Sequence, residues 1–261
     1  MAIKNILVVV SGAANEAARL DAAFALAEKH GAGVAALYVK PTAIVYSGGM
    51  GFEMTPALIE AQEREIDAAA KIAETAVKGH AERAKRTLEW RSEEGDQQTI
   101  AGIHARYADL VVASPDVARD LVFTAGAPVL AVPDGAKAKA PKRILVAWNG
   151  SREAARAVRD AADLLAAAEA VTIVVFDPTP GRSIGTDLSR LLASHGVKVE
   201  VRELVSKGGE IGGLLLDEAK IGGADLLVMG AYGHSRFREW VLGGATEEVL
   251  ADSAIPMLLS H

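Results

Sequence analysis

The chain has 261 residues, 50% of them hydrophobic and 24% charged, a balance that excludes collagen-like, low-complexity and disordered proteins. Its 28 Lys and Arg residues against 34 Asp and Glu residues give a formal net charge of -6 without a basic run, so nucleic acid is not an expected partner. There are no cysteines, which excludes disulfides and thiolate metal sites. Since no apolar segment approaches the ~20 residues that span a bilayer, and the start lacks a signal-peptide pattern, we expect a soluble cytoplasmic protein with no membrane contact.

Two segments of the chain repeat each other at a constant spacing. Residues 4–12 (KNILVVVSG) are echoed 138 positions later by residues 142–150 (KRILVAWNG). At the same spacing an apolar helical stripe occurs twice, as Ala17, Leu20, Phe24 and Ala27 and as Ala155, Val158, Ala162 and Leu165. The repetition predicts two copies of one domain, at 1–133 and 142–261, joined by an exposed Pro-, Gly-, Ala- and Lys-rich linker at 134–141.

Each copy shows strands that alternate with helices. In the second copy the expected strands are mostly continuous apolar runs, as in parallel strands covered on both faces, at 143–148, 171–176, 198–204, 225–229 and 256–259. This alternation predicts an α/β protein of two tandem, five-stranded, parallel, doubly wound Rossmann-like domains. Ligands are then expected beyond the carboxyl ends of the strands. Between the fourth and fifth strands of the first copy we expect a loop.

The first copy departs from the second after its second strand. There the chain has a glycine-rich segment with Gly48, Gly49 and Gly51, and then a pattern that predicts one long helix from Pro56 to about Lys85. A longer helical region that covers the sheet explains this insertion better than a binding lid does.

The copies differ most between their fourth and fifth strands. Ala108 and Ala127 are 19 residues apart, whereas Ala224 and Ile255 are 31 apart, so the second copy has 12 extra residues. The extra residues fall in a segment with four glycines that follows a strand and leads into a helix expected at 246–252. Glycines let the backbone approach a ligand closely, and the free N–H groups at a helix start favour anions. The segment therefore predicts a phosphate cradle, which we expect at the surface.

Other residues of this segment have two interpretations each. Thr246 suits a phosphate contact or a helix N-cap, and Glu247 and Glu248 suit the first turn of a helix without any ligand. Arg236 and Arg238, with His234, are suited to phosphate contacts or to a solvated turn.

The pattern G-x2-G-x9-G, formed by Gly230, Gly233 and Gly243 and followed by Thr246, resembles the nucleotide-binding signature of universal stress proteins. The duplicated domain is similar to the tandem members of that family, whose domains have an adenine nucleotide alpha hydrolase-like fold. The resemblance implies ATP as the ligand, with Val175 at the adenine edge. It implies a phosphate and ribose loop of Met229, Gly230, Gly233, Gly243, Gly244, Ala245 and Thr246.

Two departures from the family pattern concern the phosphates. Gly244 stands where the family usually has Ser or Thr, and Asn149 stands where the first strand usually ends in Asp. Asn149 can still hydrogen-bond but cannot bind a metal as a carboxylate does, so we expect ATP binding with or without Mg2+ and no dedicated protein metal site. The first copy has Ser11 at the equivalent position and residues 114–120 in place of the glycines, which predicts a degenerate, structural partner.

No activated nucleophile or matched acid–base pair is evident. We therefore predict a nucleotide-binding stress-response protein. The alternatives are an interaction module whose glycine segment is only structural, and a slow ATP hydrolase. The two copies are expected to pair within the chain through the open sheet edge after strand five, as a pseudo-dimer that can also form a homodimer.

Overall fold

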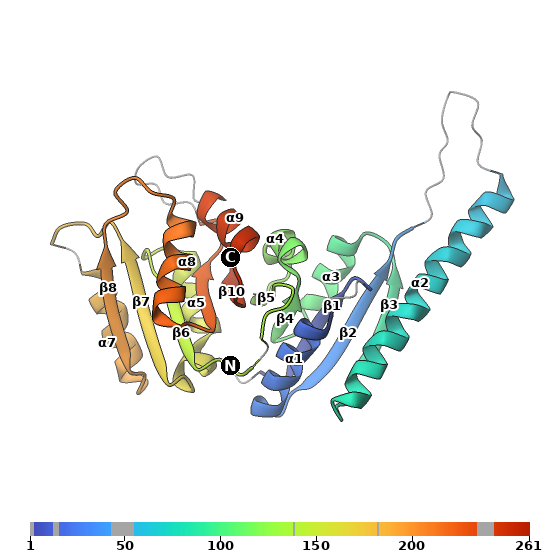
Figure 1. Ribbon diagram of the computed structural model, residues 1–261, viewed down its shortest axis with the longest axis horizontal. Coiled ribbons are helices and arrows are strands. Elements are labelled where there is room, and N and C mark those ends of the chain that lie inside the picture. The colour runs from blue at the N-terminus through green and yellow to red at the C-terminus, as the bar shows by residue number, and fades with distance from the viewer. Residues whose placement is uncertain (1–2, 13–15, 43–54, 138, 182, 234–242) are drawn as a thin grey trace, which may run out of the picture.

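The computed structural model describes residues 3–12, 16–42, 55–137, 139–181, 183–233 and 243–261 (Figure 1). Its strands form one 10-stranded sheet in the order β3-β2-β1-β4-β5-β10-β9-β6-β7-β8. Every neighbouring pair is parallel except β5 and β10. The predicted α/β class with two tandem, doubly wound domains is confirmed.

The elements follow the predicted alternation in both halves. In the first domain they are β1 (Asn5–Val10), α1 (Glu16–His30), β2 (Gly33–Lys40), α2 (Pro56–Arg83), β3 (Glu89–Glu94), α3 (Gln97–Ala105), β4 (Leu110–Ala113), α4 (Pro115–Thr124) and β5 (Val129–Ala131). In the second they are β6 (Arg143–Ala147), α5 (Arg152–Asp160), α6 (Ala162–Ala166), β7 (Ala170–Phe176), α7 (Ile184–Ser194), β8 (Val199–Leu204), α8 (Ile211–Gly222), β9 (Leu226–Gly230), α9 (Gly243–Asp252) and β10 (Met257–Ser260). Helices cover both faces: α1, α2, α5, α6 and α7 pack on one, and α3, α4, α8 and α9 on the other.

The duplication extends to individual hydrogen bonds. Asp109 accepts the backbone N–H groups of Lys4 and Asn5 at the start of β1, and Asp225 accepts those of Lys142 and Arg143 at the start of β6. Gly12 and Gly150, which follow those strands, have φ of 78° and 73°, a region open to glycine at little cost. The two halves therefore share the local geometry at both ends of their first strands.

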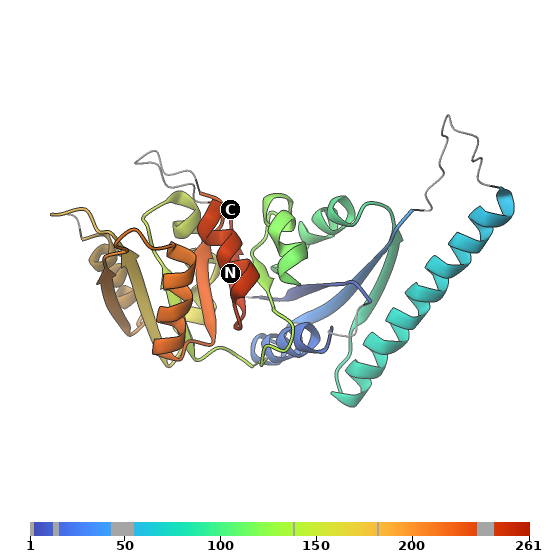
Figure 2. The same ribbon diagram turned by 45° about the horizontal axis from the view of Figure 1, so that its top comes forward.

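The helix α2 forms one long element, as predicted. Its buried residues (Ala70, Ala73, Val77 and Ala81) lie in its second half, which packs against β2 and α1. Its first half projects past the sheet (Figures 1 and 2). The segment with Gly48, Gly49 and Gly51 lies outside the described residues. None of the described helices combines the length and the apolar run that crossing a membrane would require.

Three local predictions are wrong. The segment after β4 is the helix α4 and not a loop, because the Ser114 hydroxyl accepts the Val117 N–H and Pro115 suits the first helical position. The last helix begins at Gly243, so Thr246 is not its N-cap, and Glu247 and Glu248 lie beyond its first turn. In the helical stripe, Ala17 and Ala162 are exposed.

The two domains meet at strand five, as expected. β5 pairs with β10 antiparallel, with Leu130 opposite Leu258 at the centre of a symmetric register. α4 packs against α9 beside this pairing. The seam joins the two five-stranded sheets into one (Figure 1), and so brings the first domain within reach of the glycine segment of the second.

Candidate functional site

The predicted site residues gather where the strand order of the second domain reverses. β6 pairs with β9 on one side and β7 on the other, and Ala147 is in register with both Met229 and Val174. Such switch points place ligands beyond the carboxyl ends of the strands. Asn149 follows β6, Gly230 ends β9 and Val175 is one residue from the end of β7. The structure brings these three positions to one edge of the sheet.

Gly230 and Gly233 lie tightly against the first turn of α5. A Cβ on Gly230 would lie 2.4 Å from the Ala154 backbone nitrogen, and one on Gly233 would lie 2.7 Å from a Glu153 carboxylate oxygen. Gly233 is buried, so the expectation that the glycine segment lies at the surface is wrong there. The α5 backbone leaves no room for a side chain at 230, and the Glu153 side chain fills the space at 233, so close approach and not a positive φ explains these two glycines.

The second pair of glycines begins α9. Gly243 is its first residue, and Gly244 and Ala245 complete a first turn whose N–H groups have no acceptor within the helix. A Cβ on Gly244 would have Glu248 Oε1 as its nearest neighbour at 3.7 Å, so a side chain fits there. Thr246 is buried, and its hydroxyl accepts a long hydrogen bond (3.5 Å) from the Tyr232 N–H.

The remaining predicted residues would use different groups. The Asn149 side chain is exposed, and its Oδ1 accepts the Ser151 N–H at 3.0 Å. Val175 and Met229 have buried side chains, so only their backbones can serve a ligand. His234, Arg236 and Arg238 lie outside the described residues.

Glu153 is a residue of the site that could not be predicted from the sequence, and its carboxylate adjoins Gly233. The residue is 7% exposed, and Arg152 donates two hydrogen bonds to Oε1, at 3.2 and 3.0 Å. Burial alone would raise the pKa of the Glu153 carboxyl, but hydrogen bonds from its own N–H and from Arg152, with the Arg152 charge, hold it below its ordinary value. Glu153 is therefore an anion at neutral pH. No motif marked it, because its burial depends on the distant β9.

A second missed residue, Trp148, lies between Asn149 and α7. Its indole N–H donates to the Ile184 carbonyl at 3.1 Å, and its backbone N–H donates to Val174. This half-buried ring therefore joins the ends of β6 and β7 to the start of α7. A signal existed, since Trp148 ends the strand expected at 143–148, but an aromatic at such a position is more often a core residue.

The equivalent edge of the first domain is filled by charged side chains. Glu16 accepts hydrogen bonds from the Ser11 N–H and hydroxyl, at 2.7 and 2.8 Å, and pairs with the buried Arg19 at 2.8 Å. Arg19 also pairs with Asp134 at 2.8 Å. Burial lowers the pKa of Arg19, but Glu16 and Asp134 together raise it above its ordinary value, so the guanidinium is charged.

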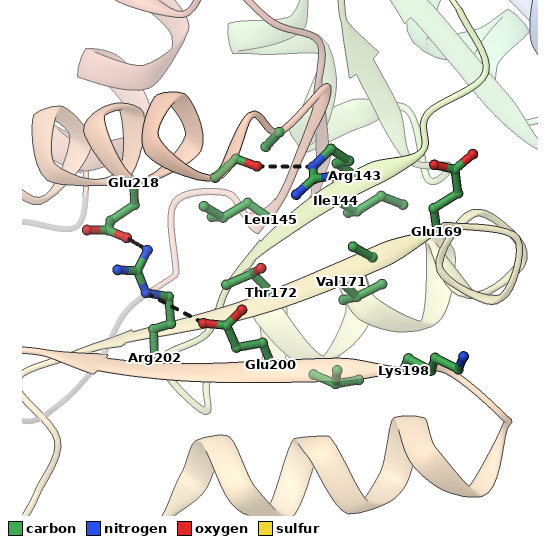
Figure 3. A pocket seen from close by; sticks show the side chains of 14 residues that line it. Arg143, Ile144, Leu145, Glu169, Val171, Thr172, Lys198, Glu200, Arg202 and Glu218 are labelled. Atoms are coloured by element: carbon green, nitrogen blue, oxygen red, sulfur yellow. Dashed lines mark hydrogen bonds and ion pairs between the residues drawn. The ribbon is translucent and has the colours of Figure 1, made fainter.

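A hollow of about 320 Å³ lies at the opposite end of the second domain, beside the amino ends of β6, β7 and β8. Figure 3 shows Arg202 between Glu200 and Glu218 on its wall, and Arg143 donating to the Gly222 carbonyl. A matching hollow of about 440 Å³ occurs at the same place in the first domain. Because both domains have this hollow, we attribute it to the fold and not to a ligand: α3 and α8 leave the amino ends of the outer strands uncovered.

A comparison with protein-family models matches residues 2–133 and 141–261 to the universal stress protein family. The chain belongs to the universal stress protein family. A stretch of 82 residues is 38% identical to the universal stress protein Slr1230 of Synechocystis sp. (strain ATCC 27184 / PCC 6803 / Kazusa), covering 31% of this chain and 27% of that protein.

Solved universal stress proteins share the fold. One from Archaeoglobus fulgidus DSM 4304 has a TM-score of 0.72 at 15% identity, covering 98% of this chain and 95% of that one. Another, solved in complex with cAMP, is 27% identical with a TM-score of 0.37, covering 46% of this chain and 97% of that one.

Proposed function

We propose that the second domain binds one adenine nucleotide, ATP with or without Mg2+, and that this universal stress protein acts in stress response or signalling. The observation that carries the proposal is the position of the glycine pattern at the β6–β9 switch point. There a tight glycine turn is hydrogen-bonded through Tyr232 to Thr246 of α9, a helix whose first amides have no acceptor within the helix.

Each predicted residue has a role in this proposal. The first-turn amides of α9, from Gly243 to Ala245, bind phosphate oxygens, since a helix start attracts anions, and the Thr246 hydroxyl holds the glycine turn by accepting the Tyr232 N–H. The backbones of Val175 and Met229 serve the adenine and ribose, and the Asn149 amide hydrogen-bonds the ligand. The first domain has no equivalent glycine turn, because Ser114 alone separates β4 from α4.

Charge limits how Mg2+ takes part. The described residues contain no group of three His, Asp or Glu side chains arranged as metal ligands. Glu153 is the one carboxylate that we find against Gly233 in the described part of the site. Any Mg2+ that accompanies ATP would therefore be held by the phosphates and water, and not by a set of protein ligands.

Calorimetric titration of the full chain with ATP tests the proposal. We expect one site per chain and a stabilisation of about 2.7 kcal/mol when ATP is at 100 times its dissociation constant. Mass analysis of small molecules released on denaturation should also find an adenine nucleotide. A stoichiometry near two would contradict the assignment to the second domain. No heat and no thermal shift at millimolar ATP would favour an interaction module, and steady phosphate release would favour the slow hydrolase.

A further inference from the structure

Tyr232 connects the glycine turn after β9 to the helix α9. Its N–H donates to the Thr246 hydroxyl, and its phenol donates to Glu247, so both of its acceptors are on α9. Its φ is 50°, a conformation that a bulky residue keeps only where surrounding contacts hold it. Burial, and then the hydrogen bond to Glu247, raise the pKa of Tyr232 well above its ordinary value, so the phenol stays protonated as a donor.

The contacts that hold Tyr232 and Glu247 come from the other domain. The centroids of the Phe123 and Tyr232 rings are 4.6 Å apart, and Arg119 Nε lies 2.8 Å from Glu247 Oε2. Arg119 and Phe123 are four residues apart on α4 and so share one face of that helix. We call this pair the α4 clamp.

His261 extends the same contact. Its ring lies 4.9 Å from Phe123, edge to face, and its Nδ1 lies 3.0 Å from the Ala231 carbonyl. Because a carbonyl only accepts, Nδ1 is the donor. Two neighbouring residues are therefore tied to Phe123 of the first domain, Tyr232 by its own ring and Ala231 through His261.

We propose that the α4 clamp positions the nucleotide site, so that the first domain, which lacks a glycine turn, sets the affinity of the second. The proposal rests on the proposed function. Because Tyr232 lies between Gly230 and Gly233, releasing it changes the path of the backbone that approaches the phosphates. Coupling is reciprocal, so nucleotide binding must also strengthen the contact between α4 and α9.

A charge-reversal cycle on the full chain tests the clamp, with ATP as the probe. Arg119→Glu and Glu247→Arg should each weaken binding about tenfold. The double variant restores the ion pair but not the acceptor of the Tyr232 phenol, because arginine only donates, so it should recover most of the loss, to within about threefold of wild type. Phe123→Ala should weaken binding about threefold. Arg64→Glu and Leu191→Ala, at exposed positions far from the seam, are the controls and should bind like wild type.

Hydrogen exchange provides a readout that does not need ATP. We expect faster exchange at the amides of Tyr232 and Thr246 in the clamp variants only. If wild type binds ATP, and the clamp variants bind ATP and exchange amide hydrogens as wild type does, the role of the α4 clamp is overturned but the proposed function is not. Wild type that binds no ATP would overturn the proposed function and the clamp's role in it. Single variants that lose affinity without rescue by the double variant would show a general loss of structure and contradict specific positioning.

Discussion

The edges beyond β1 and β6 are equivalent, and the two domains fill them in opposite ways. In the first domain the buried Arg19 pairs with Glu16 and Asp134. In the second, Ala157 occupies the position 138 residues after Arg19, and glycines at 230 and 233 pack on α5. After a duplication the two copies can therefore differ at this edge. The first copy fills it with charged side chains, while the second keeps small residues and exposed backbone there, as the proposed site requires.

Breaking the cluster of Glu16, Arg19 and Asp134 should have the largest effect on the stability of the protein. Glu16→Ala leaves Arg19 buried with one fewer anion, so we expect a loss of about 3 kcal/mol in the free energy of unfolding, measured by urea denaturation. ATP affinity should stay unchanged because Glu16 and Arg19 lie on α1 and are not part of the α4 clamp. Glu169→Ala, which removes an exposed ion pair with Lys142, is the matched control and should have no measurable effect. Equal losses in the two variants would show that Arg19 needs no anion.

Adding one carbon to Gly230 tests the other side of the comparison. The Cβ of Gly230→Ala would meet the backbone of Glu153 and Ala154 at 2.5 and 2.4 Å, so we expect a loss of about 2 kcal/mol in unfolding free energy and of ATP binding. Gly222→Ala is the control, because a Cβ there meets nothing within 4 Å. A Gly230→Ala protein as stable as Gly222→Ala would contradict the tight approach.

The missing carboxylate at Asn149 predicts a smaller effect on metal dependence. Wild-type affinity for ATP should change little when Mg2+ is chelated, whereas Asn149→Asp should bind about tenfold more tightly with Mg2+ than without it. The turn should survive, since Asp also accepts the Ser151 N–H. If wild-type affinity collapses in chelator, Glu153 becomes the candidate ligand, and Glu153→Gln should then abolish the metal dependence.

The smallest effect on ATP affinity is expected when position 244 regains the hydroxyl that the family usually has there. Gly244→Ser places a donor in the first turn of α9, where the nearest neighbour of a Cβ is 3.7 Å away. One further hydrogen bond should strengthen ATP binding about threefold, measured by titration. Gly222→Ser controls for the added side chain and should bind like wild type. An unchanged affinity in Gly244→Ser would place the phosphates away from this turn.

The order of elements could be predicted because the strands are continuous apolar runs and the copies repeat. Helix α4 was missed because ten residues with a short apolar pattern resemble a loop, although Ser114 and Pro115 are ordinary signals of a helix start. The start of α9 was placed three residues late because glycine has a low helix propensity. In the folded protein, packing on α8 and α4 overrides that propensity.

The glycine positions of the candidate site could be predicted from spacing, but their neighbours could not. Glu153 and Tyr232 acquire their environments from β9, α9 and α4, which lie far away in sequence. Arg119 and Glu247 are 128 residues apart, and neither belongs to a motif. Such pairs follow only from the register of β5 with β10, which no local pattern encodes.

The ion pair at the seam depends on the two halves of the chain having different sequences. Arg119 and Glu247 are each the fifth residue of equivalent ten-residue helices, α4 and α9, and they meet beside the symmetric pairing of Leu130 with Leu258. In an assembly of two identical subunits, a residue at this place would face its own copy, and an arginine or a glutamate would repel itself. Opposite charges can meet here only where the two halves differ in sequence, as they do within this chain. The halves are therefore not interchangeable, and separate copies of either half that paired with themselves would bring like charges together.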